Sequence, residues 1–240
     1  MNQLKPMPLF LSERNEKLVE WMDRPDADPE LLSNTYSQFS RINRLLSGWQ
    51  KIYTDFIKPE IIRNNRRASI LDIGCGGGDI IRLLSKLSSQ DGFDVSFTGI
   101  DPDERSIHFL NRQPWPDDVN FYQKTAEDLV SENQSFDIVI SNHLVHHLTN
   151  KQITEMCRTA EKLSRKLVLF SDIERSDLGY LSFQLAAPFL FRKSYIVKDG
   201  LISIRKSFRK DELQKLLPVG WTVQRRFPFR LIAIHKKKTA

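Results

Sequence analysis

The stretch SILDIGCGGGD, residues 69–79, decides the fold of this chain of 240 residues. Its first part is apolar, contains β-branched residues and lacks polar alternation, which predicts a strand buried on both faces of a sheet. Glycines follow at positions 74, 76 and 78, and residues 80–87 then carry apolar side chains at helical spacing. The sequence therefore predicts a strand, a glycine-rich turn and a helix whose free N–H groups face a ligand at the turn.

Two acidic residues enclose the glycine turn, Asp72 ahead of it and Asp79 behind it. A dinucleotide-binding loop reads G-x-G-x-x-G and places a pyrophosphate against the start of its helix. Here the pattern is D-x-G-x-G-x-G, and two carboxylates repel a phosphate in a partly buried site. The turn therefore favours a cationic ligand, and an NAD-dependent oxidoreductase is the less favoured class of protein.

This pattern resembles the first motif of the class I S-adenosylmethionine-dependent methyltransferases, whose ligand carries a sulfonium and an ammonium group. By motif, the resemblance covers residues 68–172. It implies an α/β, Rossmann-like fold, with a seven-stranded, mostly parallel sheet, helices on both faces and an antiparallel last strand. The alternation of strands and helices also predicts a parallel sheet. The resemblance further implies that the turn binds S-adenosyl-L-methionine through Asp72, Gly74, Cys75, Gly76 and Gly78.

A second predicted strand, residues 95–101, ends in an acidic residue. An acid at this place binds the ribose hydroxyls of an adenosine ligand, so Asp101 alone does not distinguish S-adenosylmethionine from NAD. The alternative is that Asp101 caps the helix that follows. The resemblance to the methyltransferases assigns Asp101 to the ribose and Pro102 to one face of the adenine.

The loop after the third predicted strand, residues 119–122, is the family's place for a contact to the adenine amino group. The family often has an aspartate there, whereas this chain has Thr125. The resemblance therefore leaves the backbone around Ala126, or the side chain of Glu127 or Asp128, as the adenine contact.

Residues 136–148, FDIVISNHLVHHL, predict a buried strand that runs into a loop with three of the chain's five histidines. This stretch resembles the fourth motif of small-molecule methyltransferases, which often ends in His-His-Leu. The resemblance implies that Ser141 and Asn142, at the end of the strand, face the methionine part of the cofactor. It also implies that the loop after them borders the substrate.

His143 and His146 are candidate general bases. Neutral imidazole can take a proton from a phenol or an acidic carbon while a methyl group is transferred. The alternative is that the histidines of this loop cap or pack the start of a helix. A metal site is not expected, since no carboxylate or cysteine accompanies His143 and His146 at ligand spacing.

Residues 1–66 are predicted to form a helical lid ahead of the first strand. Residues 16–22 suit a short helix, and Asp28-Pro29-Glu30 has the N-cap, proline and acid of a second helix start. The apolar pattern then continues over residues 31–59. Within it, NRLLSGW, residues 43–49, resembles the N-terminal motif of the quinone-biosynthesis C-methyltransferases.

Residues 67–240 are predicted to form the methyltransferase domain, with an insertion over residues 173–207 where the alternation of strands and helices stops. The insertion is too rich in apolar and aromatic residues for a disordered segment. We expect it to cap a hydrophobic substrate pocket. The alternatives are an extra helix packed on the core and a segment in peripheral contact with a membrane surface, with Arg192 and Lys193 at the headgroups.

Composition limits the class of protein further. The two cysteines, Cys75 and Cys157, do not suggest a disulfide framework. The first residues lack the apolar core of a signal peptide and no run reaches the length of a membrane span, so we expect a cytoplasmic location. The net charge is +6, with the excess late in the chain. A solvated surface is the preferred interpretation; DNA is not an expected partner and RNA is the less favoured one.

These features predict S-adenosylmethionine-dependent methyl transfer to a small, hydrophobic, aromatic acceptor, on oxygen or carbon. The hydrophobic acceptor is predicted from the apolar insertion and from the quinone-type motif. Two alternatives remain. One is an RNA methyltransferase that uses the basic C-terminal half, and the other is a protein that binds S-adenosylmethionine without catalysis. The sequence does not indicate an oligomeric state.

Overall fold

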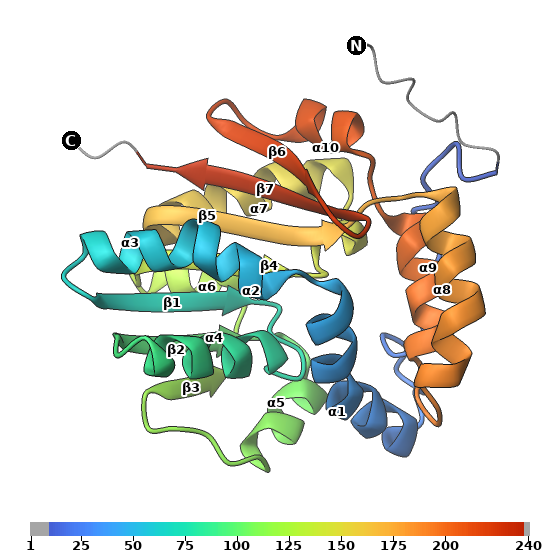
Figure 1. Cartoon of the computed structure of the whole chain (residues 1–240), viewed down its shortest axis with the longest axis horizontal. Helices are drawn as coiled ribbons and strands as arrows, with labels where there is room; N and C mark the ends of the chain where they lie inside the picture. Colours follow the sequence, from blue (N-terminus) through green and yellow to red (C-terminus); the bar gives the residue numbers. More distant parts are fainter. Residues whose placement is uncertain (1–9, 238–240) are drawn as a thin grey trace.

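The computed structural model describes residues 10–237. Residues 1–9 and 238–240 lie outside the described residues; they include the outer ends of both predicted domains and the first residues, which were compared with a signal peptide. A seven-stranded sheet in the order β3-β2-β1-β4-β5-β7-β6 forms the centre (Figure 1). β7 pairs antiparallel with both β5 and β6, and the other pairs are parallel. The predicted fold class is confirmed. The strands are β1 (Arg67–Ile73), β2 (Asp94–Ile100), β3 (Val119–Tyr122), β4 (Phe136–Asn142), β5 (Ser164–Ile173), β6 (Trp221–Arg226) and β7 (Arg230–Lys236).

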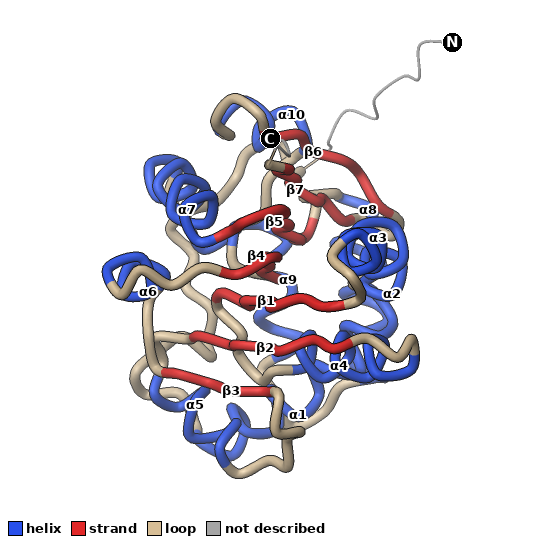
Figure 2. The backbone as a smooth tube through the Cα atoms, turned by 90° about the vertical axis from the view of Figure 1, so that its left-hand side faces the viewer, coloured by secondary structure: helices blue, strands red, loops and turns tan. Residues whose placement is uncertain are grey.

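Helices cover both faces of the sheet (Figure 2). Because successive side chains of a strand point to opposite faces, Ile70 of β1 packs in the core under α2, α3 and α4, and its neighbour Leu71 packs under α6 and α7. The covering elements are α2 (Trp49–Ile52), the π-helix Tyr53–Ile57, α3 (Lys58–Arg63), α4 (Asp79–Gln90), α5 (Glu104–Asn111), α6 (Ala126–Ser131), α7 (Asn150–Leu163) and α10 (Lys210–Leu216).

The helix start predicted at Asp28 is confirmed. α1 (Pro29–Leu46) has proline at its first position, and the Asp28 carboxylate accepts a hydrogen bond from the amide of Leu31. The short helix predicted over residues 16–22 is wrong, because these residues form turns. The amides of Trp21 and Met22 donate to the carboxylate of Asp199, at 2.7 and 3.0 Å. These two amides therefore donate to a side chain far along the sequence, whereas in a helix they would donate to backbone carbonyls of the same helix.

The segment between β5 and α10 forms two helices, α8 (Asp177–Leu190) and α9 (Ile196–Lys206), at the right-hand edge of Figure 1. They stand at the carboxyl ends of the parallel strands, where open α/β sheets bind ligands. Tyr195, just before α9, connects them to the N-terminal segment. Its amide donates to Thr35 Oγ1 at 2.9 Å, and its hydroxyl accepts from the Asp28 amide at 2.7 Å. Among residues 10–237, no helix combines the length and the apolar character needed to cross a membrane.

Candidate active site

The glycine turn lies between the end of β1 and the start of α4. Gly78 has a φ of +70°, and a Cβ atom there would lie 2.7 Å from Leu110 and 2.8 Å from Trp115. A larger residue would therefore be strained and would clash at this position. The amide of Gly76 donates a hydrogen bond of 2.9 Å to the carboxylate of Asp101. The turn thus joins the ends of β1 and β2 and leaves its backbone open to a ligand.

Three carboxylates gather at this turn. Burial, and then the charges of Asp79 and Asp101, raise the pKa of Asp72 well above its usual value. Burial also raises the pKa of Asp79 to about 6, although its carboxylate accepts a hydrogen bond of 2.8 Å from Asn43. The Oδ1 atom of Asp72 is buried without a hydrogen-bond partner. A buried group of like charges with an unsatisfied oxygen favours a cationic ligand.

The carboxylate of Asp101, at the end of β2, is held by two backbone amides. Its two oxygens accept the amides of Gly76 and Asp103, both at 2.9 Å, which fixes the orientation of the carboxylate. Burial raises its pKa. Asp101 and Pro102 both line the cavity described below, so the end of β2 forms part of its wall.

Asn142, at the end of β4, has its side-chain orientation set by two donors. Its Oδ1 atom accepts hydrogen bonds from Trp49 Nε1 at 3.0 Å and from Arg230 Nη2 at 2.7 Å. Asn142 also lines the cavity. Because the oxygen is occupied by two donors, the amide nitrogen is the polar group that Asn142 can offer to a ligand.

His143 follows directly and adopts a left-handed conformation, with φ of 60°. Arg230 Nη1 donates to its Nε2 atom at 2.8 Å. Burial and the Arg230 charge lower the pKa of His143 well below its usual value, so the ring is neutral. The lone pair on Nε2 is therefore already engaged by a buried guanidinium.

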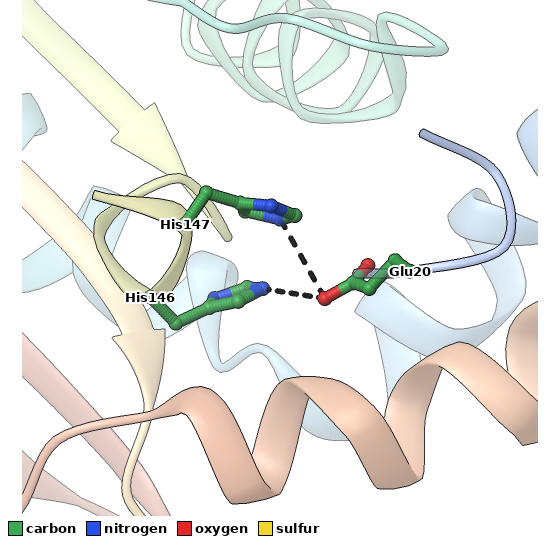
Figure 3. Close-up of side chains that lie close together, drawn as sticks. All are labelled: Glu20, His146 and His147. Atoms are coloured by element: carbon green, nitrogen blue, oxygen red, sulfur yellow. Dashed lines mark hydrogen bonds and ion pairs between the residues drawn. The ribbon is translucent and has the colours of Figure 1, made fainter. Parts of the chain in front are cut away.

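His146 lies between two buried carboxylates. Its Nδ1 atom is 2.7 Å from Asp172 Oδ1, and its Nε2 atom is 3.1 Å from Glu20 Oε1 (Figure 3). Burial disfavours the charged ring, but the two carboxylates outweigh burial and raise the pKa of His146 to about 9. The His146 ring is therefore a cation with both nitrogens donating, and in this state it has no free lone pair to act as a base.

One cavity of about 710 Å³ connects these groups. Its wall includes the glycine turn with Asp72, Asp79 and Asp101, and also Asn142 and the histidine loop. A further part of the wall is formed by apolar side chains from α1, from α8 and its C-terminal flank, and from the turn before β7. These are Phe39, Ile42, Phe183, Ala187, Leu190, Phe191 and Phe229.

The structure brings most of the predicted site residues to this cavity. Those that line it are Asp72, Gly74, Cys75, Gly76, Asp101, Pro102, Asn142, His143 and His146. Gly78, Ala126, Glu127 and Ser141 are absent from its wall. The Ser141 hydroxyl instead donates to the carbonyl of Ile73, and Glu127 accepts from Thr159 on α7.

Sequence reasoning missed Glu20, Asn43 and Arg230. Each reaches the site through a partner far along the chain, which local spacing cannot show. Of these three residues, Asn43 lies in a motif that was recognised in the sequence, residues 43–49, but no role was predicted for it. Asp79 was recognised as an acid of the turn without being assigned to the site, and the cavity includes it.

Comparison with known proteins agrees with this geometry. Residues 70–166 match the protein family described as a methyltransferase domain. The ubiquinone biosynthesis O-methyltransferase of Colwellia psychrerythraea is 30% identical over 156 residues, 63% of this chain and 57% of that protein. The protein of the same name from Coxiella burnetii is 31% identical over 154 residues, 63% of this chain and 62% of that protein. The chain thus spans about three-fifths of the length of these curated relatives.

Solved structures share the fold. The plantazolicin methyltransferase BpumL in complex with SAH has a TM-score of 0.62 and 18% identity, over 91% of this chain and 93% of that one. Human N-acetylserotonin methyltransferase in complex with SAM has a TM-score of 0.61 and 10% identity, over 88% of this chain and 57% of that one.

The fold and the site define a class of protein. The chain is a methyltransferase-fold protein with a glycine turn, acids at the ends of β1 and β2, and a cavity at the carboxyl ends of its strands. More particularly, residues 70–166 match a methyltransferase domain, and the curated relatives and solved structures reported above are methyltransferases.

Proposed function

We propose that this protein transfers a methyl group from S-adenosyl-L-methionine to a small, hydrophobic, aromatic acceptor, on oxygen or carbon. The observation that carries the proposal is one cavity whose wall combines the glycine turn and its acids with a set of apolar side chains. The acidic, glycine-lined part of the wall suits a cationic cofactor, and the apolar part suits an apolar acceptor. The curated relatives, which are named for ubiquinone biosynthesis, support an aromatic acceptor.

The acidic part of the wall suits the cofactor. The unpartnered Oδ1 atom of Asp72, together with Asp79, would hold the ammonium group, and Asp101 would hold the ribose hydroxyls. Pro102 would lie against the adenine, and the backbone of Gly74, Cys75 and Gly76 would follow the chain between them. Gly78 would serve through its conformation, by keeping the turn open. Ser141, Ala126 and Glu127, which are absent from the cavity wall, would act through the backbone they position.

When bound, S-adenosylmethionine supplies a methyl group activated by the sulfonium charge. The chain's own contribution is alignment of the acceptor and exclusion of water, effects worth roughly 7–11 kcal/mol when geometry is good. Apolar walls from α1 and α8 exclude water, and Asn142 offers N–H groups at the cavity wall. The structure favours a positioning role for His146, whose two nitrogens are both occupied. His143, predicted from the sequence as a base together with His146, has its Nε2 atom engaged by Arg230.

We further propose that residues 1–66 act as a lid and residues 173–207 as a cap on the domain of residues 67–240. The support is direct contact between the two segments. Tyr195 is hydrogen-bonded to Asp28 and Thr35, and Asp199 accepts the amides of Trp21 and Met22. Both segments contribute walls to the cavity.

The first experiment combines purified protein, methyl-labelled S-adenosylmethionine and a whole-cell extract, and partitions the label between organic solvent, RNA and protein. We expect label in the organic phase. Ala186→Trp, which adds bulk to the apolar part of the wall, should reduce that label more than about tenfold without weakening cofactor binding. Gln184→Trp, on the same helix but off the cavity wall, is the matched control. Label in RNA would overturn the proposal, and cofactor binding without transfer to any fraction would favour a binding protein.

Several basic residues of the C-terminal half are paired within the protein or buried, which argues against RNA as the acceptor. Arg225 is paired with Glu174 at 2.7 Å, Arg226 with Asp55 at 3.1 Å, and Lys236 with Glu60 at 3.6 Å. Arg230 is buried. Charges that are paired within the protein are less available for the phosphate contacts that dominate nucleic-acid binding.

A peripheral contact with an anionic membrane surface remains a prediction for α8. Its outer side exposes Leu178, Leu181, Leu185 and Phe189, and the exposed Arg192 and Lys193 follow the helix. Such an apolar stripe beside basic residues is typical of interfacial helices. Co-sedimentation with anionic vesicles should fall in Leu185→Ser but not in Val219→Ser, a fully exposed site elsewhere. Equal sedimentation of both would argue against contact through α8.

Acidification should weaken cofactor binding. The pKa of Asp79 is raised to about 6 without a ligand, and a cationic ligand favours its ionised form. The affinity for the cofactor should therefore be constant above about pH 6. Below that pH it should fall roughly tenfold per pH unit, because Asp79 must lose its proton before the cationic ligand binds. Calorimetric titration of S-adenosylmethionine across this range measures the effect. An Asp79→Asn variant should bind more weakly and lack this step; the same step in that variant would assign it to another group.

A further inference from the structure

Two histidines and a carboxylate meet on the cavity wall, although the sequence keeps them far apart. The Nε2 atom of His146 lies 3.1 Å from Glu20 Oε1, and the Nε2 atom of His147 lies 3.6 Å from the same oxygen (Figure 3). Glu20 comes from the N-terminal segment, and the histidines form the 3₁₀ turn Val145–His147 after β4. All three residues line the cavity. Separations near 3.3 Å are typical of neighbouring ligand atoms around an ion bound at about 2.0–2.1 Å.

The far nitrogen of each ring is held by a further carboxylate. His146 Nδ1 lies 2.7 Å from Asp172 Oδ1, and His147 Nδ1 lies 3.2 Å from Asp23 Oδ2. Metal-ligating histidines almost always donate their other N–H to a carboxylate, carbonyl or water, which fixes the tautomer that leaves Nε2 free for the ion. Lys206 Nζ also lies 3.3 Å from His147 Nδ1; when Nδ1–H donates to Asp23, this contact is a close approach and not a hydrogen bond.

The charges nearby leave room for a dication. Glu20, Asp23 and Asp172 are the nearby negative groups; Lys206 lies beside His147 and Asp23, and the guanidinium of Arg230 lies near Asp172. When His146 is neutral, as metal binding requires, Glu20 loses the cation that compensates it. Glu20 and His146 are almost fully buried, at 4% and 1% exposure, where uncompensated charge is costly.

A neighbouring combination, His143, His146 and Asp172, is also compact, but it is a poorer site. The Nε2 atom of His143 accepts a hydrogen bond from Arg230 at 2.8 Å. A metal ion there would have to displace a buried guanidinium, whose charge repels it. In the cluster of Glu20, His146 and His147, the neighbouring cation is Lys206. Its Nζ atom lies beside His147 Nδ1, away from the Nε2 atom that would bind a metal ion.

We propose that Glu20 Oε1, His146 Nε2 and His147 Nε2 bind one divalent transition-metal ion of the zinc type. Two imidazoles and a carboxylate suit zinc and similar borderline metals, and three protein ligands leave a coordination position open. That position would face the cavity. The metal takes the place of the proton that His146 Nε2 otherwise donates to Glu20, so binding releases a proton.

A role for the ion in methyl transfer rests on the proposed function; metal binding does not. An acceptor hydroxyl oxygen would fill the open position and lose its proton to water, since a bound dication lowers the pKa of the oxygen it binds. This would provide the deprotonated acceptor that neither His143 nor His146 supplies in its observed hydrogen-bonding state.

The binding test uses the full-length protein, stripped with a chelator and dialysed against Zn²⁺ or Co²⁺, with metal content measured by mass spectrometry. We expect one ion per chain and a Co²⁺ spectrum of low coordination number. Glu20→Gln and His147→Asn should each weaken binding at least tenfold, because loss of an outer partner alone costs about 10–100-fold. His108→Asn, an exposed histidine on α5, is the matched control and should bind as the parent does.

Thermal melts and binding of S-adenosylhomocysteine show whether each variant is folded. No ion bound by the folded parent protein, or binding equal in Glu20→Gln, His147→Asn and His108→Asn, would overturn the site. Methyl transfer is then measured on stripped and reloaded protein. Metal binding without any transfer would keep the site and count against the proposed function, so the two failures are distinguishable.

Discussion

Asp101→Ala should weaken S-adenosylmethionine binding by about 100-fold or more. Two ribose hydroxyls donating to one ionised carboxylate form charge-assisted hydrogen bonds of roughly 1.5–3 kcal/mol each, and 1.4 kcal/mol is a factor of ten in affinity. The carboxylate is already oriented by the amides of Gly76 and Asp103, so it loses little freedom when the ligand binds. Isothermal titration with S-adenosylmethionine measures the loss.

Asp101 also supports the glycine turn, so the binding experiment includes two further variants. Asp101→Asn keeps one acceptor oxygen and should show an intermediate loss. Glu104→Gln removes an exposed acid from the first turn of α5 and should bind as the parent does. If Asp101→Ala stays within a few-fold of the parent while its melting temperature is unchanged, the ribose assignment is wrong.

Arg175→Met should lower the free energy of unfolding by about 3 kcal/mol. The Arg175 side chain is fully buried, and its nitrogens donate to the carbonyls of Leu11, Ser12 and Ser207 and to both oxygens of Glu212. Methionine fills similar space but leaves the carbonyls of Ser12 and Ser207 without this donor, whereas Leu11 and Glu212 keep a hydrogen bond from Arg209. Each unsatisfied buried group costs about 1–3 kcal/mol. Because Glu212 is 40% exposed, its carboxylate can turn to water, which keeps the total below that of a fully buried pair.

Urea unfolding followed by circular dichroism measures this loss. Arg225→Met is the control, because the Arg225 side chain that pairs with Glu174 is 49% exposed, and ion pairs of exposed side chains contribute about 0–1 kcal/mol. A comparable loss in both variants would show that Arg175 does no more than a surface arginine.

The sequence predicts the parts of the site that follow directly from a strand. The turn at residues 74–78 and the acid at Asp101 each stand at the end of a buried apolar run, and parallel strands bring such ends to one edge. Asp28 was recognisable for a similar reason, since an N-cap acts within one turn of its own helix. These features are local, so spacing is enough to predict them.

The remaining parts depend on contacts across the chain. Glu20 meets His146 only because Asp199 and Arg105 hold the segment around residues 20–24 by its backbone. Spacing along the sequence does not show that Glu20 contacts His146. The expectation that no metal ligand accompanies the histidines was therefore made without Glu20. The predicted helix over residues 16–22 failed for the same reason: its local propensity was overridden by a distant carboxylate.

The hydrogen bonds of Tyr195 to Asp28 and Thr35 bear on how ligands enter and leave the cavity. They link α1, which contributes Tyr36 to the cavity wall, to the segment after α8, which contributes Phe191. Movement of either segment away from the cavity is therefore expected to displace the other. On the proposed function, we expect the used cofactor and the methylated product to leave through one shared opening.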